Sequence, residues 1–367
     1  MGEPAVQPID GPPVRLIEAR ATTSLDQNYQ PVRTALDPSG ATTVLSTSSF
    51  VLKFDRFLLP SAVGAALGHE SVCLSADLAA QVKTYADCLN PIALTPSYNP
   101  VRREVTFRQV EGMPRLLPGT RYALTVLAPV DEAASAGIRA FDGAPLGANV
   151  RLEFTVAAMD PPETQPERPP SGDFFCQRDL ECVSGMCQDD PVCTTCVRGA
   201  ALYLWACAGC HGDADTAVGL NLDVGMTFNR LDPLHATAIG HAAHQTQMGE
   251  RAHVGEHNPE RFGTAMPLID PGDPGNSYLL YKIIVGQNAV DPLLSPDQAE
   301  QVRAEIERLR GAFVMGLPMP PPKSNQSFRL FSEDPNDPLL VPHVDGTDIL
   351  TAWILDGAKT RDCTAAP

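Results

Sequence analysis

Alternation between hydrophobic and polar positions marks the first 157 residues of the chain. One short run, at 50–54, is rich in β-forming residues, and three later runs alternate between apolar and polar positions with a period of two, as in strands that bury one face. Turn signals at Pro118-Gly119 and Asp142-Gly143 separate the later runs. The pattern predicts strands at 50–54, 104–108, 122–126 and 152–156. Regularly spaced strands without a long amphipathic helix favour an all-β sandwich over residues 13–157.

The last third of the chain has helical patterns instead. We expect short helices at 199–206, 278–284, 296–309 and 348–356. The second follows Ser277, a good N-cap residue, and stops at Gly286. The last follows Thr347 and stops at Gly357. The sequence therefore predicts an all-α domain whose short helices are joined by long loops.

A proline-rich stretch separates the two halves. Residues 157–171 cannot bury a core, and their prolines favour an extended conformation. We therefore expect four segments along the chain. They are a β-sandwich at 13–157, a linker at 158–175, a small cysteine-rich segment at 176–196 and the helical domain at 197–360.

Net charge changes at the same boundary. Residues 1–170 hold 14 basic and 18 acidic side chains, whereas residues 171–367 hold 13 and 26, so most of the net charge of −17 belongs to the second half. Nucleic acid is a poor partner for such a chain, because affinity for phosphates comes from Lys and Arg. No apolar run approaches the ~18 residues that a membrane span requires.

Cysteine usage indicates an oxidising compartment, since ten cysteines are unusual in a reducing one. The first residues, Met1-Gly2-Glu3-Pro4, have neither a basic segment nor an apolar core, so we expect the export signal to lie outside the given chain. Cys73 and Cys88 stand alone in the first half and predict a disulfide.

Six further cysteines are expected to form disulfides, and the sequence leaves their pairing open. The spacing between Cys193 and Cys196 also suits a zinc knuckle, but no second pair with ligand spacing remains to complete such a site. Disulfides therefore remain the better interpretation. These six residues are Cys176, Cys182, Cys187, Cys193, Cys196 and Cys363.

One motif carries redox chemistry. Cys207-Ala208-Gly209-Cys210-His211 has the C-x-x-C-H form of covalent haem attachment. On a helix, positions i, i+3 and i+4 share a face, so two thiols can bond the haem vinyl groups while the imidazole meets the iron. Thioredoxin-like chemistry needs a strand before the motif, which is absent, and zinc would need two distant histidines. The motif predicts one covalent haem c with His211 as the proximal iron ligand.

The ligand at the sixth coordination position of the haem iron determines whether the protein is suited to electron transfer or to ligand binding. A methionine ligand raises the potential and suits electron transfer, whereas an open position suits gas binding or peroxide chemistry. Met266, Met315 and Met319 are candidates, and the proline after Met266 and Met319 would stiffen the loop that presents the sulfur. A buried core methionine is the alternative role for each.

A group of histidines lies between the motif and Met266. We expect most of these side chains to be solvated in loops, with a sixth haem ligand or another metal as alternatives. His241 and His244 are three positions apart and would share a face on a helical turn. The group comprises His235, His241, His244, His253 and His257.

The second half resembles class I cytochrome c domains, especially those of myxobacterial and planctomycete envelope proteins. The resemblance covers 197–358 and rests on four motifs in family order: Cys207–Gly212, 271–279, Met319-Pro320-Pro321 and 353–358. It implies Met319 as the distal iron ligand, opposite His211. The chain departs from the family in a longer segment after Met319 and in a second Met-Pro at Met266, which keeps Met266 as the alternative ligand.

The first half resembles the bacterial Ig-like domain of surface-layer and envelope proteins. The resemblance rests on residues 54–63, 117–126 and 154–156 and covers 50–157 well. It implies a spacer or adhesion module without catalytic residues.

Together these patterns lead to one expected function. We expect an exported monohaem c-type cytochrome that carries electrons in the periplasm or at the outer surface of a Gram-negative cell. Its acidic half predicts redox partners with basic patches. Two alternatives remain: a haem protein with an open sixth position, acting as peroxidase or gas sensor, and a structural surface protein without haem.

Overall fold

The structure is a computed structural model that describes the β-rich first half and parts of the helical second half. The described residues are 11–26, 31–64, 68–131, 136–159, 204, 207–212, 220–223, 232–243, 266–287, 295–312, 314, 319, 346–355 and 357–358. The chain divides into two compact units. The N-terminal unit is Gln7–Pro169, and the C-terminal unit is Pro170–Pro367 with Met1–Val6.

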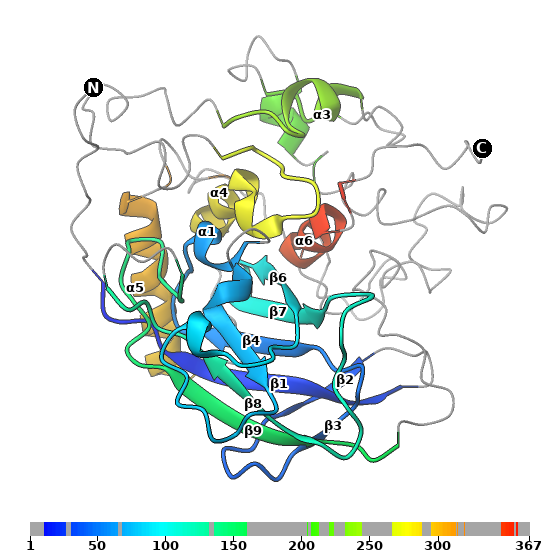
Figure 1. Ribbon diagram of the computed structural model, residues 1–367. Helices are drawn as coiled ribbons and strands as arrows, with labels where there is room; N and C mark the ends of the chain where they lie inside the picture. Colours follow the sequence, from blue (N-terminus) through cyan, green and yellow to red (C-terminus); the bar gives the residue numbers. More distant parts are fainter. Residues whose placement is uncertain are drawn as a thin grey trace, which may run out of the picture. The chain divides into compact units, whose positions relative to one another are not determined.

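The N-terminal unit contains two β-sheets (Figure 1). One has five strands in the order β2-β1-β4-β7-β6, and the other has four in the order β3-β9-β8-β5. Neighbouring strands are antiparallel except for the short parallel pair β3 and β9. The strands are β1 (Leu16–Leu25), β2 (Pro31–Ala35), β3 (Thr43–Val44), β4 (Phe50–Phe54), β5 (Val72–Ser75), β6 (Leu94–Asn99), β7 (Glu104–Gln109), β8 (Arg121–Val126) and β9 (Val150–Val156).

All four strands expected from the sequence are present as β4, β7, β8 and β9. In β9 burial alternates along the strand, and Leu152, Phe154 and Val156 turn toward the core. This is the period-two pattern that predicted the strand. Three short helical turns connect other strands: α1 (Pro60–Val63), η1 (Gly68–Ser71) and η2 (Tyr85–Asp87).

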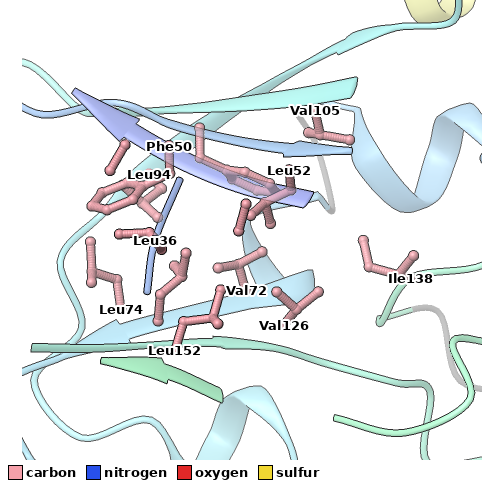
Figure 2. Packing of buried hydrophobic residues seen from close by; sticks show 14 of the residues in the cluster. Leu36, Phe50, Leu52, Val72, Leu74, Leu94, Val105, Val126, Ile138 and Leu152 are labelled. Carbon is pink, nitrogen blue, oxygen red and sulfur yellow. The ribbon is translucent and has the colours of Figure 1, made fainter. Parts of the chain in front are cut away.

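The core of the N-terminal unit lies between the two sheets. In Figure 2, Phe50 and Leu52 of β4 face Leu74 of β5 and Leu152 of β9 across the interior. Phe50 also packs against Phe154 of β9, with ring centroids 5.2 Å apart. Each fully buried side chain of this size contributes about 1.5–3 kcal/mol. The sheets therefore form a β-sandwich-like layer pair held by one hydrophobic core.

Two cross-links tie loops to this sandwich. A disulfide joins Cys73 of β5 to Cys88, as the sequence predicts, and closes the loop that contains η2. Arg56 donates hydrogen bonds of 3.2 and 2.8 Å to the two carboxylate oxygens of Asp142, and both side chains are buried. Arg56 also donates to the carbonyl oxygen of Pro12 across 2.7 Å, which fixes the start of the described chain.

The described part of the C-terminal unit consists of helices and loops. Among them α4 contacts both α5 and α6, and η7 contacts α6. None of the helices in the described ranges is long and apolar enough to cross a membrane. The helices are α3 (Asp232–Thr237), η7 (Pro274–Asn276), α4 (Tyr278–Gln287), α5 (Pro296–Ala312) and α6 (Gly346–Leu355).

The structure confirms some of the helix ends expected from the sequence, whereas α4 continues past Gly286 to Gln287. Ser277 lies directly before α4, and its hydroxyl donates to the Asp273 carbonyl oxygen while accepting from the Asp270 N–H. Gly357 takes a positive φ of 91° after α6, and the N–H groups of Gly357 and Ala358 donate to the carbonyls of Ile354 and Trp353. This pair of bonds is the glycine-terminated helix end that Gly357 predicts. Helix α6 begins at Gly346, so Thr347 lies inside it rather than at its cap.

A second hydrophobic cluster lies in the C-terminal unit. It joins Leu204, Leu222, Ile269 and Trp353 with apolar residues of α3, α4 and α6. Cys207 packs against this cluster. The segment that carries the C-x-x-C-H motif is therefore attached to the core of its unit.

Candidate functional site

The C-x-x-C-H motif lies on helical backbone, as expected. Residues Cys207 to His211 are helical, and the helix ends at Gly212. A Cβ atom at Gly212 would lie 2.6 Å from the carbonyl oxygen of Ala208, closer than any side chain tolerates. Glycine after the histidine is thus required by the close approach of the chain to the preceding turn. Of the expected helix over 199–206, only Leu204 is among the described residues, and it is helical.

Cys207 and Cys210 are thiols in the structure, in contrast to the disulfide-bonded pair in the N-terminal unit. Cys207 packs against the hydrophobic cluster, whereas Cys210 is exposed. Burial, and to a lesser extent the neighbouring Cys210, raises the pKa of the Cys207 thiol to about 12. The two thiols therefore differ in their environment.

His211 has a half-buried ring with unequal nitrogens. Its Nδ1 is buried and has no hydrogen-bond partner among the described residues, while the ring bonds the backbone of Leu220. Burial and the charge of Lys282 lower the pKa of His211, against the opposing effect of Leu220. A backbone carbonyl that bonds one ring nitrogen is a common feature of metal-binding histidines, and a lowered pKa favours the neutral imidazole that binds metals.

The segment after the motif folds back onto it. The N–H of Leu222 donates to the carbonyl oxygen of His211 across 2.7 Å, and Leu222 is fully enclosed in the hydrophobic cluster. Leu220, on the same segment, supplies the carbonyl that contacts the imidazole. Two backbone contacts from the segment that follows the motif therefore fix the position of His211.

Helix α4 passes beside the same site. Lys282 lies near enough to His211 for its charge to lower the imidazole pKa. The carbonyl oxygen of Lys282 accepts a hydrogen bond of 3.2 Å from the N–H of Met319. Helix α4 thus links the segment of the expected proximal ligand to that of the expected distal ligand.

Met266 has a different setting. Its side chain is buried, and its carbonyl oxygen accepts the N–H of Ala243 across 3.0 Å. It does not belong to the hydrophobic cluster against which Cys207 packs. Its burial suits the alternative role of a core methionine. Met315, the third candidate, lies outside the described residues.

The histidine group is only partly described. His235 lies on α3 and His241 follows that helix, and both side chains are exposed. One ring nitrogen of His241 lies 2.9 Å from the carbonyl oxygen of His235. His244, His253 and His257 lie outside the described residues, so the expected helical pair of His241 and His244 stays a prediction.

A metal site built only from protein side chains is not found in the described ranges, where no three His, Cys, Asp or Glu residues gather. The cysteines with open pairing, Cys176, Cys182, Cys187, Cys193, Cys196 and Cys363, lie outside those ranges. The donor set at the motif, two thiols with an adjacent imidazole on one helix, fits a haem that brings its own four nitrogens to the iron.

Sequence reasoning missed two residues of this site. Lys282 stands in the apolar stretch of α4, where a buried cation is unusual. The sequence alone could therefore have singled out this residue. Leu220 acts through its backbone carbonyl, which no side-chain pattern reveals.

Comparison with protein-family models, curated proteins and solved structures finds no match to this chain. The interpretation of the site therefore depends on its own residues.

Proposed function

We propose that this protein is a monohaem c-type cytochrome that carries electrons between redox partners. The observation that carries the proposal is the helical Cys207-x-x-Cys210-His211 motif, in which the imidazole keeps one buried nitrogen without a partner among the described residues. Haem c supplies one-electron chemistry when it is bound. Cys207 and Cys210 would attach it through thioether bonds, and His211 would bind its iron.

The remaining residues of the site would orient and shield the cofactor. The backbone of Leu220 bonds the ring of His211, as backbone carbonyls commonly do for metal-binding histidines. Met319 is the proposed distal ligand, and its N–H bond to Lys282 places its backbone beside α4. Trp353 and Leu222 supply apolar surface that would exclude water from one side of the site.

Haem staining after denaturing electrophoresis tests the proposal. The full chain, produced in a host with the haem-attachment machinery, should keep a stained band because only thioether-bound haem survives denaturation. The double variant Cys207→Ala/Cys210→Ala should lose the band. Cys193→Ala/Cys196→Ala removes a pair of the same spacing that Val197 follows instead of histidine, so it should keep the band. A wild-type chain without covalent haem would contradict the proposal and favour the structural surface protein.

The N-terminal unit would serve as a spacer in this proposal. Its two-sheet sandwich is compatible with the Ig-like domain that its sequence resembles. The disulfide between Cys73 and Cys88 suits an oxidising compartment, so we place the protein in the periplasm or at the outer surface of a Gram-negative cell.

A further inference from the structure

Lys282 is a buried cation in the C-terminal unit. Its side chain is enclosed on α4 and the residue is 4% exposed. It is the only buried Lys or Arg among the described residues of this unit, since the arginines of α5 reach solvent. A buried ammonium group costs several kcal/mol unless an anion compensates it. Burial accordingly lowers the pKa of Lys282 to about 8.

The neighbours of Lys282 place it at the candidate haem site. Its Nζ lies 6.0 Å from the centroid of the Tyr278 ring, and its charge acts on His211. The backbone carbonyl oxygen of Lys282 accepts a hydrogen bond from the N–H of Met319. Two other residues of α4, Leu279 and Ile283, belong to the cluster against which Cys207 packs. Helix α4 therefore bonds the backbone of Met319, places the charge of Lys282 near His211 and contributes to the cluster against which Cys207 packs.

We propose that Lys282 pairs with a carboxylate of the bound haem, an inference that depends on the proposed function. Haem carries two propionate groups, which are anionic and need cations when they are buried. Cations are scarce in this half of the chain, where 26 acidic residues face 13 basic ones. A buried ammonium at this site supplies the required charge. Its field also disfavours the extra positive charge of the ferric state, so Lys282 raises the reduction potential.

Potentiometric titration of the full chain with covalent haem tests this role. Lys282→Met and Lys282→Gln should lower the reduction potential, because each removes the charge beside the cofactor. Lys282→Arg keeps the charge and should stay closer to the wild-type potential than either neutral variant. Arg303→Gln removes an exposed charge from α5 of the same unit and should leave the potential at the wild-type value. Two neutral variants are used so that poor folding of one does not decide the result.

The outcomes separate this inference from the proposed function. A wild-type chain that carries no covalent haem overturns both. A wild-type chain with covalent haem whose potential is unchanged in Lys282→Gln or Lys282→Met overturns only the role of Lys282. Equal shifts in these variants and in Arg303→Gln also overturn it, because a general charge effect would then explain the change.

Discussion

The backbone N–H of Met319 donates to the carbonyl oxygen of Lys282 across 3.2 Å. This bond fixes the start of the Met-Pro-Pro segment against α4, the helix whose Lys282 also acts on His211. Met266 is held elsewhere, through Ala243. The structure therefore brings the backbone of one candidate ligand to the helix beside the C-x-x-C-H motif.

The first prediction concerns the sixth ligand. Met319→Ala should remove the ferric charge-transfer band that marks a methionine–iron bond and should lower the reduction potential, because a thioether ligand favours ferrous iron. The visible spectrum of the oxidised protein measures this. Met266→Ala is the matched control and should leave the band in place. The reverse pattern would make Met266 the ligand, and the absence of such a band from the wild type would favour an open sixth position.

A second prediction concerns the two thiols before haem attachment. At four pH units below its pKa, a thiol is thiolate in only about one molecule in ten thousand, so Cys207 should alkylate slowly at pH 8. Exposed Cys210 should react at least about tenfold faster. Peptide mass spectrometry of the chain produced without haem measures both rates, and Cys73 and Cys88 should stay unlabelled without reductant. Equal rates would contradict the burial of Cys207.

Much of the β-sandwich was predictable because its signals are local. The strand at 152–156 alternates in burial along its own length, and the strand at 50–54 is a short run of apolar β-forming residues interrupted only by Lys53. Gly357 ends α6 with the positive φ that glycine permits. The disulfide between Cys73 and Cys88 followed from their isolation in the first half.

Other strands of the sandwich and the contacts at the candidate site depend on residues that are far apart in the sequence. Strand β1 is rich in Ala, Thr and Ser, and its identity comes from pairing with β2 and β4 rather than from its own pattern. The parallel pairing of Thr43 and Val44 with β9 spans more than a hundred residues. At the site, the bond from Met319 to Lys282 and the contact of Leu220 with His211 are set by tertiary folding, and a motif cannot encode them.

Ionic strength provides a third prediction. Residues 171–367 hold 13 more acidic than basic side chains, so electron transfer to a basic partner protein should slow as salt rises from about 0.01 to 0.15 M. Stopped-flow rates at several salt concentrations measure the effect. Reduction by an uncharged small molecule is the control and should change little. A salt-independent rate with the basic partner would rule out electrostatic steering by this half.

The disulfide supports a fourth prediction. Cys73→Ser/Cys88→Ser should lower the free energy of unfolding of the N-terminal unit by about 3 kcal/mol, the chain-entropy value for a loop of about 15 residues. Denaturant unfolding followed by far-UV circular dichroism measures the loss. Both tryptophans, Trp205 and Trp353, belong to the C-terminal unit, so their fluorescence serves as an internal control and should keep its midpoint. A parallel shift of the fluorescence transition would mean that the two units unfold together.

Asp273 gives a fifth prediction, for pH dependence. Burial, and then the charge of Asp270, raises the pKa of Asp273 above its usual 3.8, although the N–H groups of Asn276 and Gly275 oppose this. A raised pKa in the folded state favours folding at acid pH, and that contribution is lost as pH rises above about 3.8.

Asp273→Asn should therefore gain stability relative to the wild type as pH rises from about 3.5 to 7. The amide stays neutral, and its oxygen can still accept the Asn276 N–H that now bonds Asp273 across 3.2 Å. Unfolding followed by tryptophan fluorescence at each pH measures the difference. Glu300→Gln, at an exposed position of α5, is the control and should show a much flatter difference. If the stability difference between the wild type and Asp273→Asn stays constant with pH, the Asp273 carboxylate is as well solvated in the folded chain as in the unfolded one.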